Sequence, residues 1–265
     1  MSDKLLWHPL RLLFALAVTT STTLLMPSSA HAETPLSRAM IGSLRNSVRL
    51  LLRDQAPRPA RRWDILTPGD ALSTAQSALV ELRFNDGSLA RIGERALFRF
   101  VPQRRTLRLD NGTVLLLISP GQGRTNIKTP NASAGIRGSA LFVQYTPATD
   151  TTVIGALTNS GIEVGNRNRS QNQALQAGQL AVVVRERITR IAQFDLRTFY
   201  ETNELVQGLK LSQEAPSDRS DPALAAVRAE TLDALQRQVR PSAVSVGKLD
   251  SIWQGVLISP ERPLP

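Results

Sequence analysis

Apolar and charged residues alternate through the middle of the chain, and residues that favour turns separate the alternating runs. Residues 79–84 read Leu-Val-Glu-Leu-Arg-Phe, and residues 89–92 and 97–100 continue the same two-residue period. This period places successive side chains on opposite faces of a β-strand. Asn85-Asp86-Gly87, between the first two runs, has the composition of a tight turn. The pattern therefore predicts strands joined by short turns.

The same pattern extends the predicted β-structure on both sides of these runs. Val48, Leu50 and Leu52 share one face, with Arg49 and Arg53 opposite, and residues 114–118 form an unbroken apolar run. An unbroken run predicts a strand that is buried on both faces. Further strands are predicted at residues 106–109, 152–157, 162–164 and 175–184, with turns at residues 68–70, 110–112, 159–161 and 177–179.

Three segments have the spacing of helices instead. Residues 36–45 place apolar side chains on one helical face, which predicts a short helix near the N-terminus. Residues 195–211 fit a helix better than a strand, and Pro222 begins an amphipathic run that reaches residue 240. Residues 212–221 read as a polar linker, and residues 241–265 as a proline-bearing tail.

Glycines recur along the predicted strands at intervals of roughly 25 residues. Stacked repeat units of a β-solenoid and ordinary hairpin spacing in a β-sandwich both produce such an interval. The sequence therefore predicts a mainly β fold, either solenoid-like or sandwich-like, with short helices towards both ends. The glycines that carry this interval are Gly87, Gly112, Gly138 and Gly161.

The first 32 residues read as a secretory signal. Lys4 and Arg11 provide a positive start, residues 12–18 an apolar core, and Ala30-His31-Ala32 a cleavage site before Glu33. The apolar core is shorter than the roughly 20 residues that a membrane-spanning helix needs. We therefore expect a periplasmic or secreted protein, with an uncleaved N-terminal anchor as the alternative.

The chain has no cysteine, and its two histidines, His8 and His31, both lie in the predicted signal. After cleavage neither residue type would remain. This excludes Ser-His-Asp and Cys-His nucleophilic sites and the usual zinc and copper sites. We accordingly expect no cofactor and no bound metal.

Acid–base catalysis by carboxylates is the remaining enzymatic route, because a glycosidase needs two of them in one cleft. The candidates are Glu81, Asp86, Asp110 and Glu163. Asp86 and Asp110 fall in predicted turns, where aspartate is common without catalysis. Glu81 and Glu163 fall on alternating strand positions and are expected to be solvated. We predict that the protein is not an enzyme.

The chain is strongly basic, with a formal net charge of +10 that becomes +9 after loss of the signal. Arginine accounts for 28 of its 32 basic residues. Arginine binds carboxylates and phosphates in a bidentate manner, so an anionic glycan or lipid surface is one candidate partner. The alternative is a solvated basic surface with no specific partner. Nucleic acid is not expected, because export removes the protein from it and no basic–aromatic stacking pattern is present.

Two tryptophans are candidate contacts for an envelope protein. Trp63 follows Arg61-Arg62, and it either forms a basic–aromatic contact site or caps the apolar core. Trp253 precedes an apolar run in the tail, and it either docks on a partner or folds back onto the domain.

Residues 126–143, which read Asn-Ile-Lys-Thr-Pro-Asn-Ala-Ser-Ala-Gly-Ile-Arg-Gly-Ser-Ala-Leu-Phe-Val, are the most distinctive stretch. Two apolar extended pieces flank a small-residue turn at 132–135. Lys128, Arg137 and Ser139 in isolation suggest an active site, but no histidine or cysteine is available to complete it. We therefore expect Arg137 to be a structural clamp and the glycines on either side of it to permit a close turn. The signature residues are Gly135, Ile136, Arg137, Gly138, Ser139 and Phe142.

Together with several other motifs, this stretch resembles the FecR-type periplasmic domain family. The motifs are "TPGDAL" from Thr67, "L-x-F-x-DGS" from Leu82, "L-x-NGTV" from Leu109, "TPNA…GIRGSALFV" from Thr129, "NSGIEV" from Asn159 and "LQAGQ" from Leu175. The resemblance runs from about residue 48 to 184. It implies a β-rich extracytoplasmic module that contacts other proteins. Well-known family members regulate iron-siderophore uptake through a cytoplasmic sigma-factor-binding region, and the predicted signal replaces that region here.

The sequence thus predicts five segments: a signal (1–32), an N-terminal helix, strand and Pro-rich stretch (33–62), a FecR-like β domain (63–190), a helical extension (191–211), and a linker, amphipathic helix and tail (212–265). The predicted function is a non-enzymatic envelope-binding or signalling module. The rival hypotheses are a carbohydrate-active β-solenoid enzyme and a secreted structural or adhesive protein. The sequence does not decide the oligomeric state.

Overall fold

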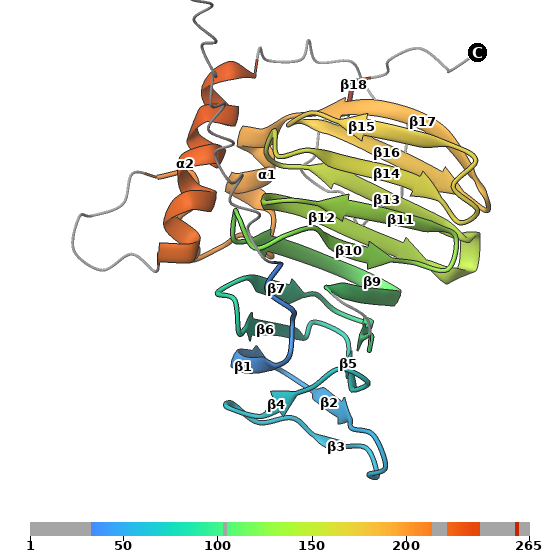
Figure 1. Cartoon of the computed structure of the whole chain (residues 1–265), viewed down its shortest axis with the longest axis vertical. Helices are drawn as coiled ribbons and strands as arrows, with labels where there is room; N and C mark the ends of the chain where they lie inside the picture. Colours follow the sequence, from blue (N-terminus) through green and yellow to red (C-terminus); the bar gives the residue numbers. More distant parts are fainter. Residues whose placement is uncertain (1–32, 103–104, 214–221, 239–257, 260–265) are drawn as a thin grey trace, which may run out of the picture. The chain divides into compact units, whose positions relative to one another are not determined.

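The computed structural model describes residues 33–102, 105–213, 222–238 and 258–259. The predicted signal and Trp253 lie outside these residues. Within the described part, the chain forms two β-sheets and two α-helices (Figure 1). The mainly β prediction is confirmed, and the sheets do not close into a barrel.

We call the two sheets inner and outer. The inner sheet runs β4 (Ile65–Leu66), β1 (Ala39–Arg45), β6 (Leu79–Phe84), β7 (Leu89–Ile92), the second half of β9 (Thr106–Ile118), β12 (Ser139–Thr146), β13 (Thr151–Ala156), β16 (Gln179–Val184), β17 (Arg187–Phe194) and β18 (Ile258–Ser259). The outer sheet runs β3 (Arg58–Pro59), β2 (Val48–Leu51), β5 (Ala71–Thr74), β8 (Leu97–Phe100), the first half of β9, β10 (Thr125–Lys128), β11 (Ala132–Ile136), β14 (Ile162–Asn166) and β15 (Asn172–Leu175).

Strand pairs enter the two sheets alternately from β10 onwards, so the chain advances along both sheets as it proceeds. The hairpins β10–β11 and β14–β15 belong to the outer sheet, and β12–β13 and β16–β17 to the inner one. Among the described strands, every pairing is antiparallel except that of β9 with β10. The two sheets pack face to face as in a sandwich, which is one of the two predicted arrangements.

Strand β9 connects the two sheets. Its first residues pair with β8 and β10 in the outer sheet, and residues from Gly112 onwards pair with β12 in the inner sheet. Gly112 has a φ of +85°, and a Cβ there would lie 2.6 Å from Cα of Ala96, so the crossing needs glycine. The predicted turn at 110–112 is therefore wrong, because the strand bends here without reversing.

The central strands of the inner sheet are covered on both faces. Val114, Leu116 and Ile118 pack into the core between the two sheets. Leu115 and Leu117 pack into a second core, beneath the helices. All five side chains are buried, which confirms the prediction that residues 114–118 are buried on both faces. The unbroken apolar run thus reflects a central layer with partners on either side.

The helices form the layer beyond the inner sheet. α1 (Leu196–Thr202) is capped by Asp195, whose carboxylate accepts a hydrogen bond from the N–H of Thr198. α2 (Pro222–Arg237) packs against the sheet, and the hydroxyls of Tyr200 and Thr231 join the two helices. The helix predicted at 195–211 ends after Thr202, and turns follow it. Within the described residues, no helix is long and apolar enough to cross a membrane.

Two further local predictions are wrong. Residues 36–45 contain β1 instead of a helix, because Ala39 and Ile41 point into the core with a two-residue period. Residues 132–135 belong to strand β11 instead of a turn. The strand predicted at 175–184 is followed by a further strand, β17, which the sequence analysis did not predict.

Candidate functional site

The signature residues divide between the two cores and a turn. Ile136 ends β11 and is buried between the sheets. Phe142 of β12 projects into the second core, beneath the helices. Its ring stacks on that of Phe199 of α1 at a centroid distance of 5.1 Å. A Cβ at Gly155, on the neighbouring strand β13, would overlap the Phe142 ring, so glycine is needed there. These positions fasten the sheets and helices together.

Arg137 and Gly138 form the turn between β11 and β12, whereas Gly135 belongs to β11 and Ser139 begins β12. Arg137 is exposed, and its guanidinium has no hydrogen-bond or ion-pair partner among the described residues. The structure therefore gives no support to the expected clamp. Gly138 has a φ of +148° and is followed by a cis peptide bond. The Ser139 side chain is buried at the start of β12 in the inner sheet, whereas Lys128 belongs to the outer sheet, so the structure does not bring them together as a site.

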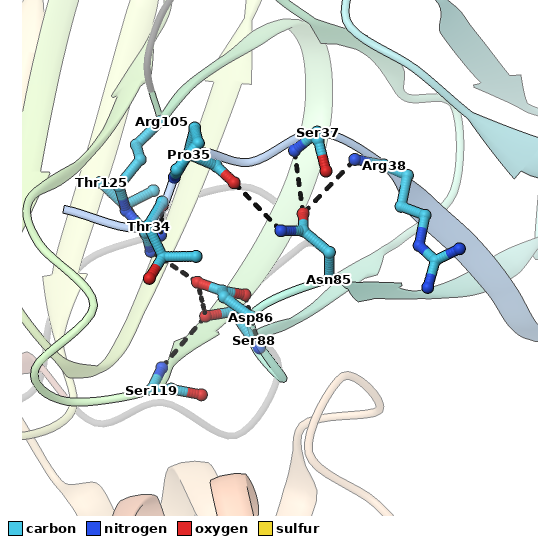
Figure 2. Close-up of polar contacts among 10 residues, drawn as sticks. All are labelled: Thr34, Pro35, Ser37, Arg38, Asn85, Asp86, Ser88, Arg105, Ser119 and Thr125. Carbon is cyan, nitrogen blue, oxygen red and sulfur yellow. Dashed lines mark hydrogen bonds and ion pairs between the residues drawn. The ribbon is translucent and has the colours of Figure 1, made fainter. Parts of the chain in front are cut away.

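The buried arginine clamp is instead Arg105, which the sequence analysis did not single out. Its Nη2 lies 2.8 Å from Oδ2 of Asp86, and neither side chain has any exposed surface. The guanidinium also donates to the Thr125 hydroxyl and to the Thr34 carbonyl, at 2.8 and 2.7 Å (Figure 2). Asp86 accepts two further hydrogen bonds, from the N–H and the hydroxyl of Ser88. The charges are thus paired and hydrogen-bonded, as buried charges must be.

The turn that holds Asp86 also fixes the segment before β1. The Asn85 side chain accepts a hydrogen bond from the N–H of Ser37 at 2.8 Å and donates to the carbonyl of Pro35 at 3.0 Å (Figure 2). Together with the bond from Arg105 to Thr34, this ties residues 34–38 to the domain. The cluster in Figure 2 is therefore an anchoring arrangement for the segment that follows the predicted cleavage site.

A second polar cluster centres on Asp70. Its carboxylate accepts hydrogen bonds from the N–H groups of Thr67 and Arg53, at 2.7 and 2.9 Å, and from the Thr67 hydroxyl at 2.8 Å. Burial raises the pKa of Asp70, but these hydrogen bonds outweigh it and hold the pKa below its ordinary value. Asp70 thereby joins the loops after β2 and β4.

The loop before β4 carries an exposed tryptophan. Trp63 is 58% exposed and Ile65 is 49% exposed, so the alternative in which Trp63 caps the core is wrong. The Arg62 guanidinium lies 4.4 Å from the centre of the Trp63 ring and donates to the Gly42 carbonyl. We call residues 58–65 the Trp63 corner. Trp63 and Trp253 are the two predicted partner contacts, and of these only Trp63 lies among the described residues.

The outer sheet presents a row of cations on its exposed face. Arg99, Arg108 and Lys128 are direct cross-strand neighbours on β8, β9 and β10. Asp110 forms ion pairs with both arginines, at 2.7 and 2.6 Å. The row therefore retains a positive charge, without any exposed aromatic side chain beside it.

Each of the four candidate catalytic carboxylates is engaged by arginine. Besides the pairs of Asp86 and Asp110, Glu81 lies 3.0 Å from Arg91, and Glu163 lies 2.7 Å from Arg124. An acid–base pair needs two carboxylates that face one substrate. The described residues place these four in separate ion pairs instead, and Glu81 is buried, although it was expected to be solvated.

Comparisons with known proteins agree with the resemblance seen in the sequence. Residues 70–160, about a third of the chain, match the family model described as FecR protein. No curated protein matches this sequence.

Solved structures give weaker similarities. A candidate anti-sigma factor from Parabacteroides distasonis is 13% identical, covers 46% of this chain and 57% of that chain, and has a TM-score of 0.40. A second structure of a candidate anti-sigma factor from this organism is 11% identical, covers 50% and 64% of the two chains, and has a TM-score of 0.41. A cell surface anchoring domain is 23% identical over 24% of this chain and 86% of that chain, with a TM-score of 0.24. Similarity at these TM-scores does not establish a shared fold over the whole chain.

Proposed function

We propose that this chain, which carries a FecR domain at residues 70–160, is a non-enzymatic signalling regulator that acts outside the cytoplasm by binding another protein. The observation that carries the proposal is the family match, because FecR domains are regulatory modules. It spans β5 to β13 and thus contains the Asp86–Arg105 clamp and the signature stretch.

The arrangement of the carboxylates supports a binding role over a catalytic one. Glu81, Asp86, Asp110 and Glu163 each face an arginine, so none stands opposite a second carboxylate across an open site. The proposal therefore places the function on a contact surface.

The extracytoplasmic location rests on the sequence of residues 1–32, with its basic start, short apolar core and Ala-x-Ala site. Residues 34–38 are held by Arg105 and Asn85, so the domain fixes the chain just after the proposed cleavage point. Such anchoring suits a mature protein that begins at Glu33.

The test combines localisation with a regulatory readout in the organism that encodes the protein. We expect a C-terminally tagged full chain in the envelope or extracellular fraction, with Glu33 as its first residue. Deleting the gene should change the transcript levels of a defined gene set, and the wild-type chain should restore them. Cytoplasmic fractionation would contradict the location, and an unchanged transcript profile would contradict the regulatory role.

The rival functions predict different results. A carbohydrate-active enzyme would release fragments from envelope glycans and lose that turnover in Asp110→Asn or Glu163→Gln variants. An adhesive or structural protein would self-associate at the cell surface, which sedimentation of the purified chain detects. We expect neither turnover nor concentration-dependent assembly.

A further inference from the structure

Exposed apolar surface is concentrated at one place. Trp63 and Ile65 are the only large hydrophobic side chains that are strongly exposed among the residues that the structure describes. They lie two residues apart in the Trp63 corner. A cluster of exposed apolar side chains among polar neighbours marks an interaction site more often than scattered ones do.

The Trp63 side chain is held in place before any partner arrives. Its φ is +73°, which is unfavourable for a bulky residue. Its N–H donates to the carbonyl of Ile41 at 2.9 Å, and this bond fixes the backbone. Arg62 covers one face of the ring and is anchored by a 2.9 Å hydrogen bond to Gly42. Trp63 lies within the turn of residues 61–64, in which the N–H of Asp64 donates to the Arg61 carbonyl at 3.2 Å. A rigid aromatic side chain loses little entropy on binding.

The corner is also an open edge of the inner sheet. Among the described strands, β4 pairs only with β1. The backbone of Ile41 faces β4, because Ile41 donates to Asp64 and accepts from Trp63. The backbone of Met40 therefore faces the opposite side, towards β6. Ile65 lies opposite Met40, so the two residues do not exchange backbone hydrogen bonds. The N–H and C=O of Ile65 therefore point away from β1, towards the open edge.

The charge around the corner is positive. Residues 58–65 contain Arg58, Arg61 and Arg62 against one acid, Asp64. Arg58 binds both carboxylate oxygens of Asp64 at 2.8 Å, so that pair is neutral. Arg61 and Arg62 are exposed and have no ion-pair partner among the described residues. Two cations therefore flank the exposed tryptophan.

We propose that the Trp63 corner is the docking surface for an extended, acidic segment of a protein partner. This proposal rests on the proposed function, in which the protein binds another protein. Trp63 and Ile65 would contact apolar side chains of the segment, Arg61 and Arg62 its carboxylates, and Ile65 its backbone. Tryptophan and arginine are the residue types that most often dominate the energy of such interfaces.

The open edge decides between a polypeptide and other anionic ligands. Only an extended chain offers an N–H and a C=O at the spacing that the edge residue requires. An acidic glycan or a lipid headgroup would satisfy the arginines but not this backbone pair. The cationic row of Arg99, Arg108 and Lys128 has no exposed edge or aromatic side chain, so it serves as the comparison surface.

The test uses site-specific photo-crosslinking of the full chain in living cells. p-Benzoylphenylalanine is placed at position 63, and in separate variants at position 128 on the outer sheet and at position 197 on α1. We expect a protease-sensitive adduct of defined mass from position 63. Peptide sequencing of that adduct should identify an acidic extended segment of the partner.

Charge variants with a matched control define the surface. Arg61→Glu combined with Arg62→Glu should reduce the yield of the adduct by about tenfold or more, because the two new carboxylates repel those of the partner segment. Arg167→Glu combined with Arg169→Glu makes the same change in net charge in the exposed loop before β15 and should leave the adduct unchanged. Thermal unfolding of each variant confirms that it folds.

The outcomes separate the two proposals. Protein adducts from position 128 or 197 but not from 63 would overturn the corner while leaving the binding function intact. An adduct with lipid or glycan at position 63 would also overturn the corner. Absence of any protein adduct from all three positions would count against the binding function itself.

Discussion

The guanidinium of Arg105 lies 2.8 Å from the carboxylate of Asp86, and both side chains are completely buried. The pair joins the turn between β6 and β7 to the start of β9. Through the Thr34 carbonyl it also holds the segment before β1. One ion pair therefore connects three parts of the chain that are far apart in sequence.

We expect Arg105→Met to lower the free energy of unfolding by about 3–5 kcal/mol, because it leaves the Asp86 carboxylate buried without its partner. Asp86→Asn combined with Arg105→Met should cost less than the sum of the two single changes. Urea unfolding followed by circular dichroism measures all three variants. Additive losses would show that the two side chains are not energetically coupled.

Arg137→Ala is the control for this comparison. Arg137 is exposed, and its side chain has no partner among the described residues. Surface changes of this kind alter stability by about 0.5 kcal/mol or less. A loss comparable to that of Arg105→Met would restore the clamp that the sequence suggested for Arg137.

Asp70 makes the stability depend on pH. Its pKa is lowered below its ordinary value of 3.8 in the folded state, so the unfolded chain binds the proton more readily. The stabilisation is therefore fully present above about pH 5 and declines as the pH falls through the folded-state pKa. Asp70→Asn should cost about 1–3 kcal/mol at pH 7 through its lost hydrogen bonds. The difference between the wild type and this variant should be smaller at pH 3 than at pH 7, and an equal difference at both values would refute the assignment.

The sequence predicted most strands because their alternation reflects the core directly. The run at 79–84 became β6, and the run at 114–118 became the buried half of β9. The prediction of an N-terminal helix was wrong because a short segment can fit both the helical and the strand period. In residues 36–45 the apolar side chains have helical spacing, while Ala39 and Ile41, which enter the core, are two residues apart.

The Arg105 clamp and the exposed Trp63 could not be predicted from local sequence patterns, because both depend on contacts between distant parts of the chain. Unlike Arg137, which has glycines close on either side, Arg105 has no neighbouring residue that marks it, and its partner Asp86 lies two strands earlier in the chain. A buried arginine beside an Asp-Gly-Ser turn is recognisable only once β6, β7 and β9 are placed together. Likewise, the exposure of Trp63 follows from β4 being the last strand of the inner sheet.

Gly155 and Phe142 should be coupled in the core beneath the helices. An added Cβ at Gly155 overlaps the Phe142 ring, which is stacked on Phe199, so the ring has no free space to enter. Gly155→Ala should therefore cost about 1–3 kcal/mol through overpacking. Gly155→Ala combined with Phe142→Leu should cost less than the sum of the two single changes. Urea unfolding measures this cycle, and additivity would contradict the contact.

The charge around Trp63 should be visible in fluorescence quenching. In a chain whose other tryptophans, Trp7 and Trp253, are replaced by phenylalanine, emission reports Trp63 alone. Iodide should quench it more strongly than caesium, because Arg61 and Arg62 attract anions. Added salt should reduce this difference through screening. Equal quenching by the two ions at low salt would contradict the positive potential.

The backbone conformation of Trp63 makes a separate prediction about stability. At a φ of +73°, alanine retains the steric strain of an L-residue, whereas glycine relieves it. Both substitutions remove the same stacking with Arg62, worth about 0.5–1 kcal/mol at an exposed site. Trp63→Gly should therefore be more stable than Trp63→Ala by about 1 kcal/mol, and close to the wild type. Urea unfolding followed by circular dichroism measures the difference, and an alanine variant as stable as the glycine variant would show that the positive φ is not maintained. A glycine variant that keeps its stability but no longer co-purifies with the partner identified by crosslinking would show that tryptophan at this position serves binding at the expense of backbone strain.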